Sequence, residues 1–147
     1  GVLNVVNRLL EIIQPKKIYL GNKDFQQLYL IKEHIKKNKI NTIIVPCKTI
    51  RNNKFIAYSS RTSKLKQYEI INLANIIKFL KNYKKRIVLK KINHNIKEIR
   101  NKILLLGAKK VDYVELLNLK TMKKPKRNKF SLFFAFNIGN IRFIDNF

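Results

Sequence analysis

Apolar residues recur at helical spacing in several stretches of the chain, with polar residues between them. The spacing is typical of amphipathic helices, which bury one face. Pro15 and Gly107 follow two of these stretches, and both residue types are common just beyond the end of a helix. The pattern predicts helices over residues 2–14, 24–37, 66–82 and 96–106.

Short apolar runs alternate with these helices and predict strands. The runs at 17–20 and 42–46 each follow a helix, which is the rhythm of a parallel α/β sheet. Later runs surround a Gly139-Asn140 turn and indicate an antiparallel hairpin. The later strands are expected at 111–117, 130–137 and 141–145, and a basic loop is expected at 120–129. Residues 83–92 fit either a strand or a linker.

The change of rhythm after residue 61 predicts two domains. Residues 1–62 have the pattern of a parallel α/β sheet, and residues 63–147 have that of a small α+β module with antiparallel strands. Two strands do not make a complete parallel sheet, and the pattern opens on a helix. We therefore expect the beginning of the sheet to be missing from this sequence.

The composition narrows the class of protein. The formal net charge of +25 suggests a polyanion partner. However, the lysines are scattered over every segment, and the excess of Lys, Ile and Asn is typical of an A/T-rich genome. We expect weak nonspecific nucleic-acid binding at low salt and no specific nucleic-acid partner.

The location of the protein is predicted from three further features. No run of 18 apolar residues predicts a membrane span, and no leader pattern is present. The single Cys47 cannot form an intramolecular disulfide and is interpreted as a small buried residue at a strand end. We expect a cytoplasmic protein.

Polar residues gather where the strand at 17–20 meets the following helix. Gly21, Asn22, Lys23 and Asp24 stand at the carboxyl end of the strand, where open α/β sheets hold their ligands. A lysine and free backbone N–H groups favour a phosphate, and the Gln27 amide suits a polar substrate. Asp24 and Gln27 also fit a capping box, which would make this junction purely structural.

A second polar cluster follows the second strand. Ser59, Ser60 and Arg61 offer two hydroxyls and a guanidinium fork that suits phosphate oxygens. A helix cap with a surface Arg is the alternative. Two such clusters after consecutive strands favour a shared phosphate ligand.

Four stretches resemble the later part of pantothenate synthetases, the pantoate–β-alanine ligases of the HIGH-motif nucleotidylyltransferase superfamily. "GVLNVVNRLLEIIQPKKIYLGNKDFQQL" is similar to the family's G-V-x-T-V-V-x-K-L-F…Q-P…F-G-E-K-D-x-Q-Q-L, and "VPCKTIRNNKFIAYSSRTSKL" to its V-P-x-x-R-x-x-D-G-L-A-M-S-S-R-N-x-x-L. "VDYVELL" resembles V-D-Y-x-E, and "GNIRFIDN" resembles G-x-x-R-L-I-D-N. The resemblance runs in order from the first residue to the last.

The resemblance implies a fold and a reaction. Residues 1–62 would be the C-terminal half of a Rossmann-like nucleotide-binding domain, and residues 63–147 a C-terminal lid. The family uses ATP to activate pantoate as pantoyl adenylate with loss of pyrophosphate, and the β-alanine amine then displaces AMP to give pantothenate. Magnesium is expected on the phosphates, and the intact enzyme is expected to be a homodimer.

The resemblance also assigns residues. Gly21, Asn22, Lys23 and Asp24 would belong to the ATP site, with Lys23 on the phosphates, and Gln27 would bind pantoate. The backbone at Ile50 matches a position that meets adenine. The loop expected to close over the phosphates consists of Tyr58, Ser59, Ser60 and Arg61.

Several positions depart from the family pattern. Tyr58 replaces a Met, Lys54-Phe55 replaces Asp-Gly, Asn22 replaces a Glu, and Thr62 replaces an Asn. Loss of that Gly puts the turn geometry of the loop in doubt. The family's H-x-G-H signature is expected upstream, because His34 and His94 do not form it and are predicted to be surface residues. No catalytic residue or metal ligand is therefore assigned here.

These departures leave alternatives open. The chain is interpreted as a C-terminal portion that is inactive alone, either a truncated gene product or one product of a split gene. A noncatalytic remnant or a basic nucleic-acid-binding protein is the competing interpretation.

Overall fold

The computed structural model describes residues 1–89, 93–125 and 130–147. The chain forms two compact units, Gly1–Thr49 and Ile50–Phe147, and each is described by itself. The sequence placed a domain boundary near residue 62, whereas residues 50–61 belong to the second compact unit. Ile56 explains this difference, because it lies in the hydrophobic core of that unit. The domain boundary at residue 62 stays a prediction.

The first unit is a two-stranded parallel sheet with two helices. Its elements are α1 (Val2–Ile13), β1 (Lys17–Gly21), the short 3-10 helix η1 (Asn22–Asp24), α2 (Phe25–Lys37) and β2 (Ile43–Cys47). β1 and β2 are parallel, with Lys17 opposite Ile43 and Gly21 opposite Cys47. The predicted parallel α/β arrangement is confirmed.

One face of this sheet carries the core of the first unit. Leu10 of α1 and Ile31 and Ile35 of α2 are buried against apolar side chains of both strands. Ile18 and Ile44, which contribute to this core, are opposite each other in the register. Both helices therefore pack on the same face of the sheet, since side chains alternate between faces along a strand.

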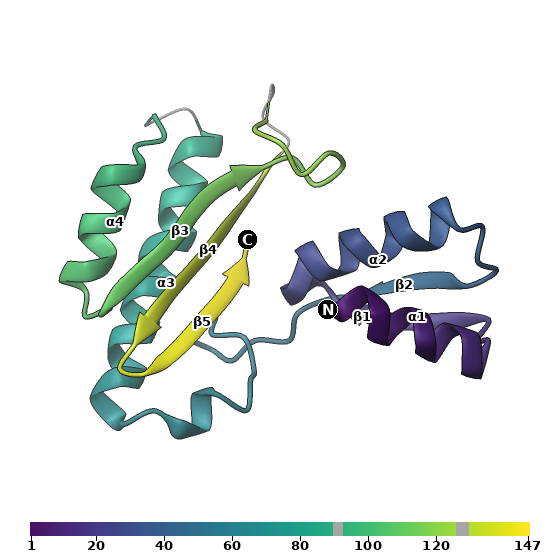
Figure 1. The fold of residues 1–147 in the computed structure, drawn as a ribbon. Coiled ribbons are helices and arrows are strands. Elements are labelled where there is room, and N and C mark those ends of the chain that lie inside the picture. The colour runs from purple at the N-terminus through teal and green to yellow at the C-terminus, as the bar shows by residue number, and fades with distance from the viewer. Residues whose placement is uncertain (90–92, 126–129) are drawn as a thin grey trace. The chain divides into compact units, whose positions relative to one another are not determined.

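The second unit contains the helices α3 (Gln67–Val88) and α4 (Ile96–Leu105), preceded by the 3-10 helix η2 (Thr62–Lys64). Its sheet consists of β3 (Lys110–Leu117), β4 (Ser131–Ile138) and β5 (Ile141–Asn146). The strands are antiparallel in the order β3-β4-β5, as predicted. Figure 1 shows α3 and α4 on one face of this sheet.

The core of the second unit lies between this sheet and its helices. Phe134 and Phe136 of β4 are fully buried, and their rings stack with centroids 5.9 Å apart. Leu73 and Leu80 of α3 belong to the same cluster. The expected hairpin is present, with Ile138 opposite Ile141 across the Gly139-Asn140 turn.

Helix α3 is longer than the sequence predicted. The pattern placed its end at 82 and left 83–92 open between strand and linker, but the helix continues to Val88. Tyr83 is buried and Ile87 packs against the core, so the helical apolar spacing continues for another turn. The last part of this segment, 90–92, and part of the basic loop, 126–129, lie outside the described residues.

Gly107 ends α4 as predicted. Its φ is +101°, which only glycine adopts readily, and its N–H donates to the Leu104 carbonyl. A Cβ here would stand 2.3 Å from the Asn72 side-chain nitrogen on α3. The glycine therefore allows close packing as well as the turn.

Candidate functional site

The first predicted cluster lies at the junction of β1, η1 and α2. Gly21 is the last residue of β1, Lys23 lies in η1, and Gln27 is exposed in the first turn of α2. Asp24 is the N-cap of α2, but its side chain accepts no capping hydrogen bond. The capping-box interpretation was therefore wrong, which leaves the ligand interpretation of this cluster as the prediction to test.

Gly21 has no structural need to be glycine in the first unit. Its backbone is extended, with φ −71° and ψ 134°, a conformation that every residue adopts. A Cβ at this position would meet no atom within 4 Å. The open space above Gly21 suits the close approach of a ligand to the backbone.

The second predicted cluster lies on a loop of the second unit. Ile50 and Tyr58 are joined by a backbone hydrogen bond of 3.1 Å from the Tyr58 N–H to the Ile50 carbonyl. Both side chains are largely exposed, 74% for Ile50 and 68% for Tyr58. The Tyr58 side chain therefore does not fill the core, and it is accessible to a ligand.

A tight turn follows Tyr58. The Ser59 hydroxyl accepts a hydrogen bond of 3.2 Å from the Arg61 N–H, and the Ser59 carbonyl accepts one from the Thr62 N–H. Ser60 and Arg61 are exposed. The turn thus fixes the backbone while the side chains of Ser60 and Arg61 face solvent. The hydroxyl oxygen of Thr62 is buried and has no hydrogen-bond partner in the described part of the chain.

The replacement of the family's glycine by Phe55 does not abolish the turn. Phe55 adopts a left-handed conformation with φ +63°. The Asn52 side chain accepts hydrogen bonds of 3.0 Å from the Lys54 and Ile56 N–H groups, which holds the turn in place. The Lys81 ammonium of α3 lies over the Phe55 ring. The loop therefore forms a hydrogen-bonded turn without the glycine, with strain at a residue that has a Cβ.

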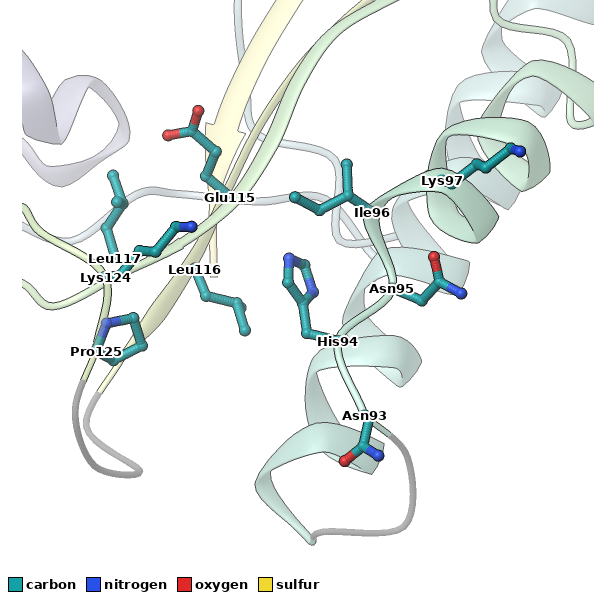
Figure 2. Close-up of a pocket in the computed structure, with 10 residues that line it drawn as sticks. All are labelled: Asn93, His94, Asn95, Ile96, Lys97, Glu115, Leu116, Leu117, Lys124 and Pro125. Atoms are coloured by element: carbon teal, nitrogen blue, oxygen red, sulfur yellow. The ribbon is translucent and has the colours of Figure 1, made fainter.

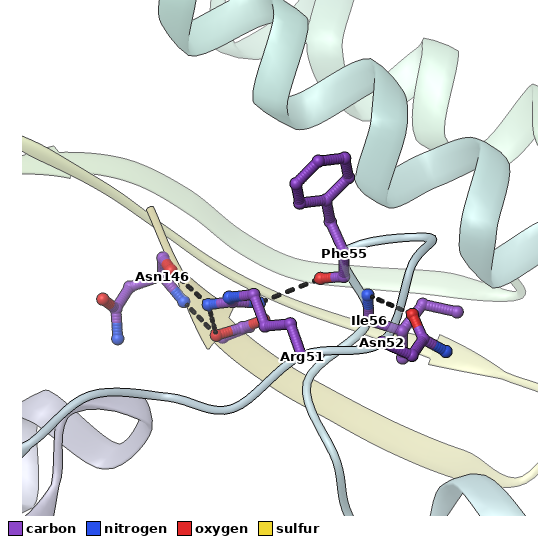
Figure 3. Close-up of polar contacts among 6 residues, drawn as sticks. Arg51, Asn52, Phe55, Ile56 and Asn146 are labelled. Atoms are coloured by element: carbon purple, nitrogen blue, oxygen red, sulfur yellow. Dashed lines mark hydrogen bonds and ion pairs between the residues drawn. The ribbon is translucent and has the colours of Figure 1, made fainter.

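Arg51 anchors the loop to the last strand, and sequence reasoning assigned it no role. Its guanidinium donates to both carboxylate oxygens of Asp145, and to the backbone carbonyls of Asn146 and Phe55 (Figure 3). Its ζ carbon also lies 4.8 Å from the centroid of the Phe147 ring. The motif "GNIRFIDN", noticed only as a family signature, thus supplies the partner that positions the loop.

The two predicted clusters belong to different compact units. Gly21, Asn22, Lys23, Asp24 and Gln27 lie in the first unit, and Ile50, Tyr58, Ser59, Ser60 and Arg61 lie in the second. Within each unit the residues of a cluster are near neighbours in the sequence, so their proximity does not test the predicted site. A nucleotide bound by both clusters stays a prediction.

A separate cavity of about 930 Å³ lies in the second unit and is lined by none of the predicted site residues. Figure 2 shows His94 and Ile96 on one side of it and Leu116 and Lys124 on the other. The two histidines, which the sequence predicted to be surface residues, are both of intermediate exposure.

Both histidines have hydrogen-bond partners. His34 Nε2 lies 2.7 Å from Asn7 Oδ1, and His94 Nδ1 lies 3.1 Å from the Tyr83 hydroxyl. Burial, with a smaller contribution from the Lys124 charge, lowers the pKa of His94. Burial raises the pKa of Tyr83. These contacts give both histidines structural roles.

The described residues were searched for metal-binding clusters and for membrane-spanning helices. Residues 1–89, 93–125 and 130–147 contain no group of three or more His, Cys, Asp or Glu side chains that could hold a metal ion. Among the same residues, none of the helices combines the length and apolarity needed to span a bilayer. Cys47 ends β2 as predicted, but it is only partly buried.

Known proteins match the chain over its whole length. The model of the family "Pantoate-beta-alanine ligase" matches residues 1–147. The "Pantothenate synthetase" of Flavobacterium psychrophilum is 35% identical over 99% of this chain and 53% of the relative. That of Clostridioides difficile is 39% identical over 100% of this chain and 54% of the relative. The chain therefore spans about half the length of the curated relatives it matches.

Solved structures agree with this assignment. The pantoate-beta-alanine ligase of Francisella tularensis, "Complexed with Beta-gamma ATP and Beta-alanine", is 36% identical with a TM-score of 0.77. The match covers 100% of this chain and 49% of that one. A pantothenate synthetase from Thermus thermophilus, at 21% identity and a TM-score of 0.82, shares the fold. From the family match over all 147 residues we conclude that the chain belongs to the pantoate-beta-alanine ligase family.

Proposed function

We propose that this chain supplies part of the ATP site of a pantothenate synthetase. The intact enzyme would condense pantoate with β-alanine through a pantoyl adenylate, and it would release AMP and pyrophosphate. The observation that carries the proposal is the family match over residues 1–147, a range that includes both polar clusters. A relative's structure with a β,γ-ATP ligand and β-alanine supports the substrate class.

The first cluster is suited to the phosphates and to pantoate. Lys23 would supply positive charge to the phosphates, and the absence of a side chain at Gly21 would let the nucleotide approach the backbone. Asn22 and Asp24 would complete this part of the ATP site. Gln27, exposed in the first turn of α2, would hydrogen-bond pantoate.

The second cluster is suited to adenine and to the leaving pyrophosphate. The Ile50 backbone would meet adenine beside the Tyr58 ring, and Ser59, Ser60 and Arg61 would close over the phosphates. Fixed donors and cations of this kind stabilise the charge that develops as the α-phosphate is attacked and pyrophosphate leaves. Arg51 would act indirectly, by holding the loop through Asp145.

Magnesium would be held by the nucleotide. The described residues offer no cluster of metal-ligating side chains, so its ligands would come chiefly from the ATP phosphates. When bound, it would neutralise phosphate charge. A homodimer of the intact enzyme and a cytoplasmic location are further predictions from the family.

Reconstitution tests the proposal. We expect negligible pantothenate formation by this chain alone, because it spans about half of its relatives, and restored formation when the unmatched portion of the Clostridioides difficile relative is co-expressed.

In the reconstituted enzyme, Lys23→Ala should slow adenylation at least tenfold, about 1.4 kcal/mol. Lys37→Ala, at the far end of α2, is the matched control. Pantothenate formation by the chain alone would contradict the proposal that it is only part of the enzyme. A wild-type adenylation rate in Lys23→Ala would show that Lys23 does not act on the phosphates.

A further inference from the structure

The second unit contains a surface pocket of about 630 Å³ that gathers positive charge. The pocket lies between helix α3 and the turn at residues 53–55. Four lysines line it, namely Lys54 of the turn and Lys78, Lys81 and Lys85 of α3. None of the eight Asp and Glu residues of the chain is among the described residues that line it. These four lysines, here called the lysine cluster, therefore line one pocket without a carboxylate in its described walls.

Helix geometry places three of these lysines in one row. Lys78, Lys81 and Lys85 are three and four positions apart, so they lie on the same side of α3. The row is about 10 Å long at the helical rise of about 1.5 Å per residue. This length is close to the screening distance of about 8 Å at physiological ionic strength, so the three charges can act together on one anion. The fold thus concentrates charge that the sequence pattern alone left scattered.

The end of the helix does not account for this row. Lys85 lies in the last turn of α3, where a cation interacts favourably with the helix dipole. Lys78 and Lys81 lie before that turn, and the dipole effect falls off within it. Among the described residues, none of the four lysines takes part in an ion pair. Helix stability therefore leaves most of the lysine cluster unexplained.

Phe55 holds one of the ammonium groups at the pocket. Lys81 Nζ lies 2.9 Å from the centroid of the Phe55 ring, and Figure 3 shows this ring reaching from the turn toward α3. An ammonium has three N–H donors, and contact with one ring face leaves donors for a ligand. A side chain that is already held in place also loses less freedom when it binds. The left-handed backbone of Phe55 thus places its ring where it orients Lys81.

Apolar and amide side chains complete the pocket. Ile71 and Ala74 of α3 line it beside Phe55. Lysine stems pack readily along such apolar surface while the ammonium stays at the solvent side. Asn75 and Asn82 also line the pocket, and their amides can donate hydrogen bonds to phosphate oxygens. The lining thus combines cations, neutral donors and apolar surface, as small-molecule sites commonly do.

The charge of this pocket is particular to this chain. Lys54 and Phe55 stand where the family pattern has Asp and Gly. An Asp at position 54 would remove one positive charge and add a negative one, and a Gly at position 55 would remove the ring beneath Lys81. The pocket is lined by residues of the second unit alone, so it does not depend on the two-stranded sheet of the first unit.

We propose that the pocket binds a small anion that carries two or more phosphate groups. Lysine binds phosphate as a point charge, and a row of about 10 Å matches a chain of phosphates better than a single phosphate or carboxylate. A volume of about 630 Å³ is in the usual range for small-molecule sites. The anion is an inorganic oligophosphate or the phosphate chain of a nucleotide. This site is additional to the proposed ATP site, with which it shares no residue.

Nuclear magnetic resonance of the ¹⁵N-labelled full chain tests the proposal at a salt concentration of about 0.15 M. Tripolyphosphate is the probe, and the amide signals of residues 53–55 report binding at the pocket. We expect these signals to shift until the site is saturated. A triple variant, Lys54→Gln with Lys78→Gln and Lys81→Gln, should weaken this binding by about tenfold or more.

A second triple variant controls for net charge. Lys102→Gln, Lys109→Gln and Lys120→Gln remove the same charge from exposed positions of the second unit outside the pocket. We expect this variant to weaken binding by no more than about threefold, because charge at longer range is screened at this salt concentration. Equal weakening in the two triple variants would show that tripolyphosphate follows the overall charge, and the proposal would fail.

A milder variant keeps the test informative. Circular dichroism of both triple variants separates loss of binding from loss of folding. Lys54→Asp changes one exposed residue of the turn and restores the acidic residue of the family pattern. It should weaken tripolyphosphate binding by about threefold or more, because an anion repels the added carboxylate. Unchanged binding in a folded Lys54→Asp variant would contradict the proposal.

Two nucleotides identify the source of the phosphates. ATP that binds at residues 53–55 more tightly than tripolyphosphate would identify nucleotides as the ligand, whereas equal or weaker binding would identify the phosphate chain alone. AMP has one phosphate and should bind about tenfold more weakly than ATP, or weaker still. AMP that binds as tightly as ATP would mean that the pocket recognises the base, which would overturn the proposal.

Further results would also count against the pocket. One is a folded chain whose signals at residues 53–55 do not shift with tripolyphosphate. Another is a shift that Lys23→Ala abolishes and the pocket variant keeps, which would place the anion at the proposed ATP site. A short single-stranded RNA that shifts these signals where tripolyphosphate does not would identify nucleic acid as the occupant instead. None of these measurements needs pantothenate formation, so this proposal and the proposed function fail independently.

Discussion

Arg51 and Asp145 form a bidentate ion pair that joins the start of the second unit to its last strand. Only 19% of the Arg51 side chain and 6% of the Asp145 side chain are exposed. Removing one partner of such a pair leaves an uncompensated charge in a poorly solvated place, which costs far more than the loss of a surface pair. The pair therefore couples the shape of the candidate phosphate loop to the hairpin of β4 and β5.

Arg51→Ala should consequently lower the free energy of unfolding by about 3 kcal/mol. Urea denaturation monitored by circular dichroism measures the change. Arg142→Ala is the control, because Arg142 pairs with Asp112 with 49% and 20% of these side chains exposed, and the expected loss is at most about 1 kcal/mol. Equal losses in the two variants would show that the Arg51 pair is no more than a surface contact.

Phe55 holds a left-handed backbone conformation that a glycine adopts without strain. Phe55→Ala loses the ring under Lys81 and keeps the strain, whereas Phe55→Gly loses the same ring and relieves it. The Gly variant should be more stable than the Ala variant by about 1 kcal/mol. Thermal unfolding of the two proteins compares them directly. An Ala variant as stable as the Gly variant would mean that the turn relaxes to another conformation.

Thr62 carries a buried hydroxyl oxygen that has no hydrogen-bond partner within the described residues. Thr62→Val replaces it with a methyl group of similar shape, so the variant should be more stable by about 1 kcal/mol. Chemical denaturation of the free chain checks this. Thr62→Ser keeps the hydroxyl and should show no gain. A destabilised Val variant would reveal a partner for the hydroxyl.

His94 should make the second unit sensitive to acid. Its pKa is lowered in the folded protein, so the unfolded chain binds a proton more readily. The stability that depends on neutral His94 is present above about pH 6.5 and is lost as the pH falls through the lower folded pKa. The melting temperature should therefore fall between pH 8 and pH 5, and less so in His94→Gln. His34→Gln should retain the wild-type fall, and a flat profile in the wild type would refute the prediction.

Helices and turns could be predicted from the sequence where a local residue pattern was enough to determine them. The apolar spacing in α1 and α2 and the Gly139-Asn140 turn each satisfy a local rule, so their positions follow from neighbouring residues. The end of α3 was missed because Tyr83 and Ile87 extend the helix through contacts with the distant core. Asp24 and Gln27 matched a local capping rule that the structure does not use.

The site was predictable only in its residue types. Lys23 and Arg61 could be singled out because lysine and arginine next to glycine and serine suit phosphates. The anchoring role of Arg51 could not be, because its partner is 94 positions away in the sequence. The left-handed Phe55 was equally hidden, since the Asn52 side chain and Lys81 support a turn that the sequence alone disfavours.

The distance along the chain between Arg51 and Asp145 also has a consequence during translation. Residues 50–57 leave the ribosome long before β5 is synthesised, so the Arg51 guanidinium must stay hydrated until Asp145 emerges. A nascent chain stalled before that point would display residues 50–61 without their anchor. Its susceptibility to a protease should drop sharply once the final strand is released.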